Sequence, residues 1–131
     1  MIDPANPITA DGKGDSSGRA RDGVSAGSVV SNLLSTGAHY VKAFGTVSAQ
    51  SLSSQAERTP ERAVLFYATD DDQAADVVER LISAAGFQPV KVGGVDQALR
   101  IEVFGELHDL GGQEGKLLEA ERPHAALAAS A

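Results

Sequence analysis

The sequence contains no cysteine, which excludes a disulfide scaffold, an iron–sulfur cluster and a cysteine-ligated zinc site. It has no apolar run near the roughly 20 residues that cross a bilayer, and its polar N-terminus lacks the apolar centre of a signal peptide. Basic residues are outnumbered, with 11 Lys and Arg against 18 Asp and Glu and a net charge of −7. Non-specific nucleic-acid binding needs a basic face. We therefore expect a cytoplasmic protein with no nucleic-acid or membrane partner.

The common catalytic motifs are also missing. There is no G-x-S-x-G nucleophile elbow and no Walker phosphate loop. The three histidines, at 39, 108 and 124, are far apart in the sequence, whereas a zinc site needs three or four converging donors. Asp70-Asp71-Asp72 could supply carboxylates to Mg²⁺ or Ca²⁺, but acids at the start of a helix commonly cap it, and we favour capping. The sequence thus predicts no catalytic residue and no metal site.

What is present is enough apolar sequence for one domain, since 42% of the 131 residues are hydrophobic. Residues 1–27 begin with a strand end at Ile2-Asp3 and a proline-defined turn, followed by a glycine- and serine-rich stretch that predicts a mobile loop. Within it, Gly12 to Gly18 resembles a dinucleotide fingerprint, with Arg19 and Arg21 as partners for a 2′-phosphate. Because no complete strand precedes the glycines and no helix follows, we favour a flexible loop.

Residues 28–112 carry the pattern of an α/β domain. We expect a helix from an N-cap at Ser28 to Gly37, and one or two helical turns at 48–54. A third helix, from 72 to 85, has one apolar stripe. Extended segments are predicted at 39–44, 63–68, 87–92 and 99–104. The stripe comprises Ala74, Val77, Val78, Leu81, Ile82 and Ala85.

The segment 63–68 is apolar without alternation, which is typical of a strand covered on both faces in a parallel sheet. Strand, helix and strand then form a right-handed βαβ unit, so the fold class is α/β, a partial Rossmann-like open sheet with helices on its faces. Residues 113–131 predict a short helix at 116–122 and an alanine-rich tail.

Two strand ends are candidates for ligand contact. Gly93-Gly94 places bare backbone at the end of a predicted parallel strand, where open α/β sheets bind ligands, although a tight turn explains the glycines equally well. The segment Ala43-Phe44-Gly45-Thr46 poses the same choice between a plain turn and a pocket wall.

Three segments, in this order, resemble the later part of the deazaflavin-dependent NADP oxidoreductase family. They are Ile2-Asp3-Pro4-Ala5-Asn6-Pro7, then Val41-Lys42-Ala43-Phe44-Gly45-Thr46, and the run from Val64 through Asp71 to Val92-Gly93-Gly94. The resemblance spans roughly residues 2–122 and is dispersed rather than concentrated in one motif.

That resemblance implies a Rossmann-type fold in which NADP(H) exchanges a hydride with 8-hydroxy-5-deazaflavin or a similar acceptor. It implies that the segment holding Pro4, Asn6 and Pro7 lies beside the nicotinamide. It also implies that Ala43, Phe44, Gly45 and Thr46 line the place where the two redox rings stack, and that Gly93 and Gly94 approach the acceptor coenzyme. Hydride transfer between two cofactors requires alignment and water exclusion more than a protein acid or base.

Two departures from the family affect this prediction. Gly45 stands where family members usually carry Asn or His, which removes a polar contact. The family's glycine fingerprint and first strands have no counterpart here, so we expect a C-terminal portion that binds NADPH weakly or not at all and exposes an apolar sheet edge prone to oligomerisation. The alternative is a free-standing, non-enzymatic α/β module that binds a partner or dimerises through its sheet.

Overall fold

The computed structural model describes residues 1–10, 16–19, 23–112 and 117–119. Its main sheet has the strand order β1-β4-β5-β6, formed by Ile2–Asp3, Val41–Ala43, Val64–Ala68 and Gln88–Gly93. β1 runs parallel to β4 and β5 runs parallel to β6, but β4 and β5 are antiparallel. The fold is therefore α/β, as predicted, with an open mixed sheet rather than an all-parallel one.

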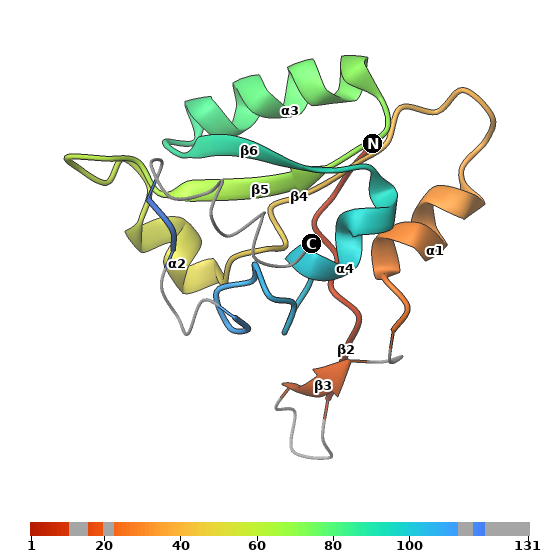
Figure 1. Ribbon diagram of the computed structural model, residues 1–131, viewed down its shortest axis with the longest axis horizontal. Coiled ribbons are helices and arrows are strands. Elements are labelled where there is room, and N and C mark those ends of the chain that lie inside the picture. The colour runs from red at the N-terminus through yellow and green to blue at the C-terminus, as the bar shows by residue number, and fades with distance from the viewer. Residues whose placement is uncertain (11–15, 20–22, 113–116, 120–131) are drawn as a thin grey trace.

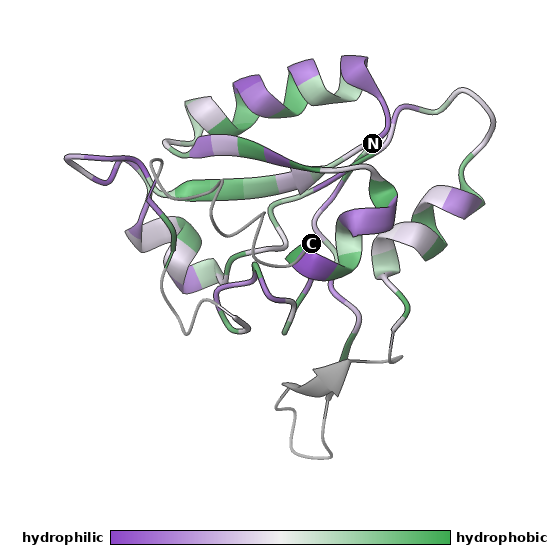
Figure 2. Ribbon diagram, in the orientation of Figure 1, coloured by the Kyte–Doolittle hydropathy of each residue, from purple (hydrophilic) through white to green (hydrophobic). Residues whose placement is uncertain are grey.

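Helices cover both faces of this sheet (Figure 1). The helix α3 (Asp72–Ala84) packs on one face against Leu65 and Tyr67, and α4 (Ala98–Ile101) packs on the other against Val64 and Phe66. All five residues of β5 are buried, and Figure 2 shows most of this strand as hydrophobic. The prediction of a strand covered on both faces is thus confirmed. The other helical elements are α1 (Ala26–Leu33), α2 (Ala49–Ser54) and a 3₁₀ turn at Val95–Gln97.

Helix α1 begins earlier than predicted. Its N-cap is Ser25, whose Oγ accepts a hydrogen bond from the Ser28 backbone N–H at 2.9 Å, so Ser28 is inside the helix. Gly27, the second residue of the helix, packs tightly against the start of α4, because a Cβ built there would lie 2.8 Å from the Cβ of Ala98.

The predicted extended segment at 99–104 is wrong, because residues 98–101 form helix α4 and residues 102–104 form a bend and a turn. Ala98 and Ile101 are both buried, at a spacing of three residues that suits one helical turn. The short apolar run did not distinguish a strand from a buried turn of helix.

The apolar stripe of α3 also differs from the prediction. Ala74, Val78 and Ile82 are buried, but Val77 and Leu81 keep 51% and 46% of their surface exposed, and Ala85 is exposed. The periodicity is correct for a helix. The sheet in this chain covers only part of the apolar surface that α3 offers.

The glycine-rich stretch contains paired strands where no regular structure was predicted. β2 (Ile8–Ala10) and β3 (Ser16–Arg19) form a separate two-stranded antiparallel sheet. Most of the fingerprint-like run, from Gly12 to Asp15, and Arg21 lie outside the described residues. The boundaries of the three predicted regions stay predictions.

The predicted helix at 116–122 is wrong for the residues that can be described there. Residues 117–119 are extended, with the Val64 N–H donating to the Leu118 carbonyl at 2.9 Å and an antiparallel bridge between Ala63 and Glu119. The other residues of that segment and the alanine-rich tail lie outside the described part of the chain. Within the described part, no helix is long and apolar enough to cross a membrane.

Candidate functional site

The ends of β1 and β4 lie side by side, because these neighbouring strands are parallel and in register from Ile2 opposite Val41 to Asp3 opposite Lys42. Each strand then leaves the sheet at once, at Pro4 and at Phe44, whose φ of 66° turns the chain sharply. Adjacent carboxyl ends of parallel strands are where open α/β sheets hold ligands. Residues 2–7 and 41–46, the first two segments of the predicted cofactor site, therefore meet at the end of the sheet where β1 and β4 stop. This end is called the edge formed by β1 and β4.

Asn6 ties these two segments together. Its Nδ2 donates to the Gly45 carbonyl at 2.8 Å, and its Oδ1 accepts from the Val103 N–H at 2.8 Å. Gly45 itself packs on the β1 turn, since a Cβ there would come within 2.7 Å of the Pro4 carbonyl oxygen. Close backbone packing thus explains the glycine at this position. The polar side chain of Asn6, rather than one at residue 45, is held beside it.

The remaining predicted residues at this edge differ in exposure. Pro4 is exposed and Pro7 is half-buried, whereas Ala43 is fully buried in the core. Phe44 packs partly against the core. Thr46 is 2% exposed, and its carbonyl accepts from the Asp109 N–H at 3.1 Å. Gly45 is also buried, so contacts to a ligand are available from Pro4, Ala5 and part of Phe44, and not from Ala43, Gly45 or Thr46.

The carboxylate of Asp109 is hydrogen-bonded to the segment that follows Thr46. Its Oδ2 accepts from the Ser48 N–H at 2.8 Å, and its Oδ1 lies 3.2 Å from Nδ1 of the buried His108. The same Nδ1 lies 3.0 Å from the Leu110 backbone nitrogen, which donates to it. Burial raises the pKa of Asp109, but hydrogen bonds from Ser48 and Ser51 outweigh burial and lower it overall.

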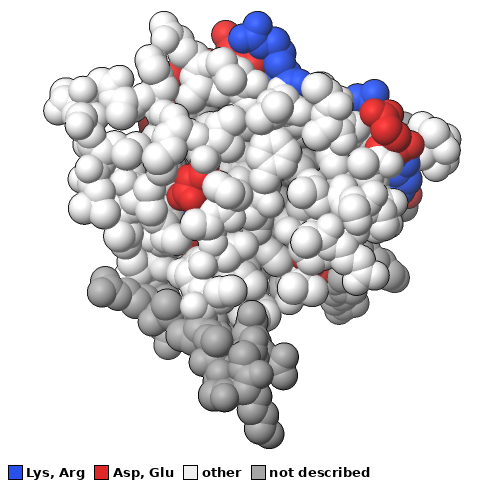
Figure 3. Space-filling model, turned by 180° about the vertical axis from the view of Figure 1, so that it is seen from behind, with Lys and Arg blue, Asp and Glu red and all other residues white. Residues whose placement is uncertain are grey.

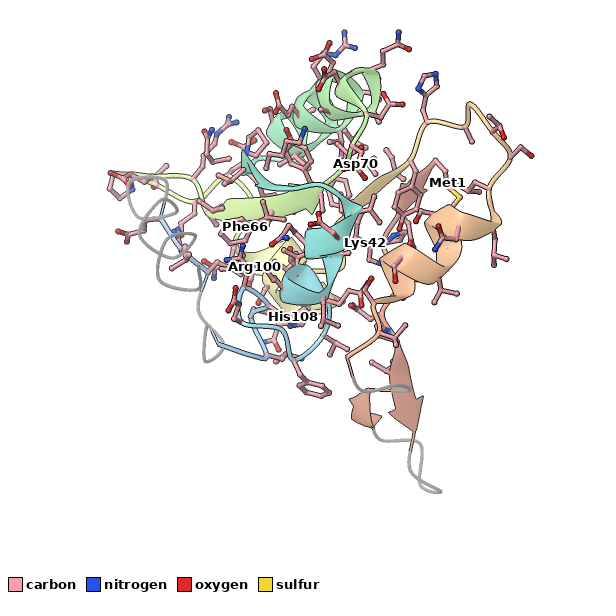
Figure 4. All side chains as sticks on the ribbon, turned by 45° about the vertical axis from the view of Figure 1, so that its right-hand side comes forward. Met1, Lys42, Phe66, Asp70, Arg100 and His108 are labelled. Atoms are coloured by element: carbon pink, nitrogen blue, oxygen red, sulfur yellow. The ribbon has the colours of Figure 1, made fainter. Side chains whose placement is uncertain are left out.

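A buried charged cluster, formed by Asp3, Tyr40, Lys42 and Glu102, lies directly behind the edge. The Lys42 ammonium is 3.1 Å from Asp3 Oδ2 and 3.6 Å from Glu102 Oε1, and it also donates to the Ala5 carbonyl. Tyr40 donates to the same Asp3 oxygen at 2.6 Å. In Figure 4, Lys42 lies between α4 and α1. All four side chains are at least nine-tenths buried, so this cluster holds the edge rigidly.

The environment in this cluster lowers the pKa of Asp3 and raises the pKa of Tyr40. Burial raises the pKa of Asp3, but hydrogen bonds from Tyr40 and the Ala5 N–H, with the positive charge of Lys42, bring it below its usual range. Burial and the adjacent Asp3 carboxylate raise the pKa of Tyr40 far above its ordinary value. Asp3 is therefore ionised and Tyr40 protonated at neutral pH.

Glu102 occupies the N-terminus of α1. Its Oε1 and Oε2 accept from the Gly27 and Ala26 backbone N–H groups at 2.8 and 3.0 Å. The other two multi-turn helices are also capped from within the chain, α2 by Ser48 and α3 by Asp71, which accepts from the Ala74 N–H at 2.9 Å. Helix N-termini are common phosphate sites. In the described part of the chain, those of α1, α2 and α3 are already filled.

Gly93 and Gly94 lie at the opposite end of the sheet from the edge formed by β1 and β4, because β5 and β6 run the other way. Gly93 has a φ of 134° and accepts the Thr69 N–H, and the Val95 N–H donates to Asp70 Oδ2 at 3.1 Å. The two glycines thus form a tight turn closed by Asp70. Beside it is a polar pocket of about 230 Å³, lined by residues that include Ser31, Ser35, Asp70 and Asp71.

The structure confirms capping as the role of Asp71, and in the described residues no three His, Cys, Asp or Glu side chains are grouped to hold a metal. Pro4, Asn6 and Gly45 come together, while Gly93 and Gly94 do not join them. The sequence did not predict that Lys42 and Glu102 form part of the buried charged cluster. A lysine inside an otherwise apolar strand was the available signal, since a buried lysine requires carboxylate partners.

Comparisons with known proteins support the fold and show no family. No family model matches the sequence, and no curated protein matches it either. Among solved structures, a hypothetical protein, SMa0349 from Sinorhizobium meliloti, matches with a TM-score of 0.70 and 27% identity. The alignment covers 90% of this chain and 53% of that one. The chain thus spans about half the length of its structural relative.

Proposed function

We propose that this chain forms part of an NADP-dependent oxidoreductase and supplies the surface on which a hydride passes between NADP(H) and a deazaflavin or similar acceptor. The observation that carries the proposal is the edge where β1 and β4 end together. There Asn6 fixes the turn at Pro4 against the backbone of Gly45. Pro4 and Ala5 form the exposed surface of these strand ends, with Gly45 buried beneath them, and a surface held in this way is a platform that can support a planar ring.

The role of this platform in hydride transfer is to position the nicotinamide against the acceptor ring. A nicotinamide supplies the hydride when bound, and the chain's own contribution is to orient it and to exclude water. The buried pair of Lys42 and Asp3 stiffens the platform from behind, because breaking either contact would leave an uncompensated charge. No acid or base from the protein is required for such a transfer.

The phosphates of the coenzyme need binding groups other than the helix N-termini of this chain. Glu102 fills the N-terminus of α1, and Asp71 fills that of α3. We therefore expect this chain alone to bind NADPH only weakly, so that millimolar concentrations are needed, with the pyrophosphate held by elements outside it. The partial coverage of the longer Sinorhizobium meliloti structure is compatible with this division.

A non-enzymatic interaction module is the second candidate. The observation that favours it is the half-exposed Val77 on α3, beside β1, which among the described residues has a strand on one side only. A module of this kind would bind a protein partner and would show no specific response to nicotinamide at the edge formed by Pro4 and Gly45.

Nuclear magnetic resonance of the ¹⁵N-labelled chain separates the two candidates. Millimolar NADPH or 5-deazariboflavin should shift the amide signals of Ala5 and of residues 44–46. The matched control is 2′,5′-ADP, which carries the adenosine half without the nicotinamide and should leave those signals in place. Equal shifts with 2′,5′-ADP, or no shift at these amides with either ring compound, would contradict the proposal.

A further inference from the structure

We infer that His108 and Asp109 form a buried pH-sensitive switch. Nδ1 of His108 accepts the Leu110 N–H while the ring is neutral and donates to the Asp109 carboxylate once the ring is protonated. This inference goes beyond the hydride transfer proposed above and does not depend on it. It rests on two contacts of one ring nitrogen that no single protonation state satisfies together.

Nδ1 of His108 faces a donor and an acceptor at the same time. The Leu110 backbone nitrogen lies 3.0 Å from it, and Oδ1 of Asp109 lies 3.2 Å from it. A ring nitrogen has either a proton, which it donates, or a lone pair, which accepts. With the lone pair, Nδ1 binds Leu110 and faces another lone pair on Asp109. With a proton, it binds Asp109 and loses the bond from Leu110, so the two hydrogen bonds are alternatives.

The carboxylate of Asp109 has one oxygen available for such a donor. Its Oδ2 accepts the Ser48 N–H at 2.8 Å, whereas its buried Oδ1 has no hydrogen-bond partner among the described residues. Leaving a buried carboxylate oxygen without a donor costs free energy. A proton on Nδ1 of His108 would satisfy this oxygen and leave the bond to Ser48 in place, because the two contacts use different oxygens.

The pair is shielded from solvent. His108 and Asp109 are 2% and 1% exposed, and in Figure 4 His108 lies beneath α4. On the face shown in Figure 3, by contrast, most of the charged side chains lie in the upper half of the view, at the surface. Burial opposes a charged ring and the adjacent carboxylate favours it, so His108 and Asp109 titrate as a coupled pair.

Asp109 is the ionisable side chain that the described contacts place against His108. Arg100 and Glu106, on the same stretch of chain, form an ion pair with each other. The facing segment contributes the hydroxyls of Ser48 and Ser51, which do not ionise at these pH values and donate to Asp109. The charge that sets the protonation of His108 is therefore that of Asp109.

Protonation should have opposite effects on the two sides of the pair. The Leu110 N–H loses its acceptor, and the Leu110 side chain is already 55% exposed. Asp109 gains a donor and keeps its bonds to the Thr46 carbonyl and the Ser48 N–H, next to the edge formed by β1 and β4. Mild acid should thus loosen the chain at Leu110 without loosening the segment 46–48.

Nuclear magnetic resonance of the full ¹⁵N-labelled chain tests the switch between pH 8 and pH 5, because histidine ordinarily titrates at about pH 6.5. Long-range ¹H–¹⁵N correlations report which ring nitrogen is protonated. We expect Nδ1 of His108 to be unprotonated at pH 8 and protonated at pH 5. Over the same range, hydrogen exchange at the Leu110 amide, corrected for the intrinsic effect of pH, should accelerate about tenfold, and exchange at the Ser48 amide should not.

Asp109→Asn tests the role of the carboxylate. The amide oxygen can still accept the Ser48 N–H, and the amide N–H₂ can donate to a neutral Nδ1, so the midpoint of the His108 titration should fall by about one pH unit or more. The matched control, Asp76→Asn, removes the same charge at an exposed position and should leave the midpoint unchanged. Circular dichroism verifies that each variant is folded. If Asp109→Asn does not fold, the pH series on the unaltered chain decides.

Four outcomes would overturn the inference. They are a proton on Nδ1 at pH 8, no protonation of His108 between pH 8 and pH 5, unchanged exchange at the Leu110 amide when the ring is protonated, and an equal change of midpoint in the two variants. None of these measurements uses NADPH or an acceptor. A confirmed switch together with unshifted amides at residues 44–46 on addition of NADPH would retain this inference and contradict the oxidoreductase.

Discussion

Glu102 Oε1 accepts the backbone N–H of Gly27 at 2.8 Å, so a carboxylate from the end of α4 caps the first turn of α1. The same carboxylate lies 3.6 Å from the Lys42 ammonium and is fully buried. One side chain therefore joins α1, α4 and β4. It also places a negative charge at the positive end of the α1 dipole.

Replacing Glu102 with glutamine should destabilise the protein by roughly 1–3 kcal/mol, because the amide N–H₂ faces backbone N–H donors and Lys42 loses one of its two carboxylates. Urea unfolding at pH 7 measures the change. Glu57→Gln is the control, since that side chain is 68% exposed and its loss should stay within about 0.5 kcal/mol. An equal effect of the two substitutions would show that the cap contributes little.

Asn6→Ala should destabilise the protein by about 1–3 kcal/mol, because the Val103 N–H and the Gly45 carbonyl each lose their hydrogen bond to the Asn6 side chain. The matched control is Asn32→Ala, an exposed position inside α1 where alanine favours the helix and stability should not fall. Thermal unfolding of both variants gives the comparison. If Asn6→Ala unfolds like the wild type, the edge is not held together by this amide.

The outcome for Asn6 illustrates what the sequence could and could not predict. The α/β class, β5, α3 and β6 follow from local apolar patterns, which are sufficient because their partners are near in the sequence. The contacts of Asn6 join residues 39 and 97 positions apart. No local pattern predicts a pairing of that range, so the resemblance could point to Asn6 without giving its role.

The same limit applies to the strand directions. The resemblance implied that Gly93-Gly94 and the turn at Gly45 contact the same pair of cofactors. The antiparallel pairing of Lys42 with Ala68 sends β5 and β6 the other way. That reversal depends on the path of the chain between residues 44 and 63, which carries no sequence signal for direction.

Acid should unfold the protein through Asp3 and Asp109. Both have a native pKa below the unfolded value of about 3.9, so each contributes stability that is present above that value and lost as pH falls through the native pKa. Urea unfolding from pH 7 to pH 2.5 should show this decline below about pH 4. Asp3→Asn should lower stability at pH 7 and flatten the decline, whereas the exposed Asp76→Asn should do neither. A stability that is constant down to pH 3 would contradict the assignment.

Alkaline titration should show that both tyrosines stay protonated until the protein unfolds. Burial and a carboxylate partner, Asp3 for Tyr40 and Glu79 for Tyr67, raise the pKa of each phenol well above its usual range. An unfolded tyrosine ionises near pH 10, so the unfolded state loses protons that the native state keeps, and stability falls as pH rises beyond about 10. Tyrosinate absorbance at 295 nm should therefore appear only together with the loss of circular dichroism at 222 nm. Tyr67→Phe leaves Tyr40 as the single phenol, and a midpoint near pH 10 in that folded variant would show that Tyr40 is not bound to an ionised Asp3.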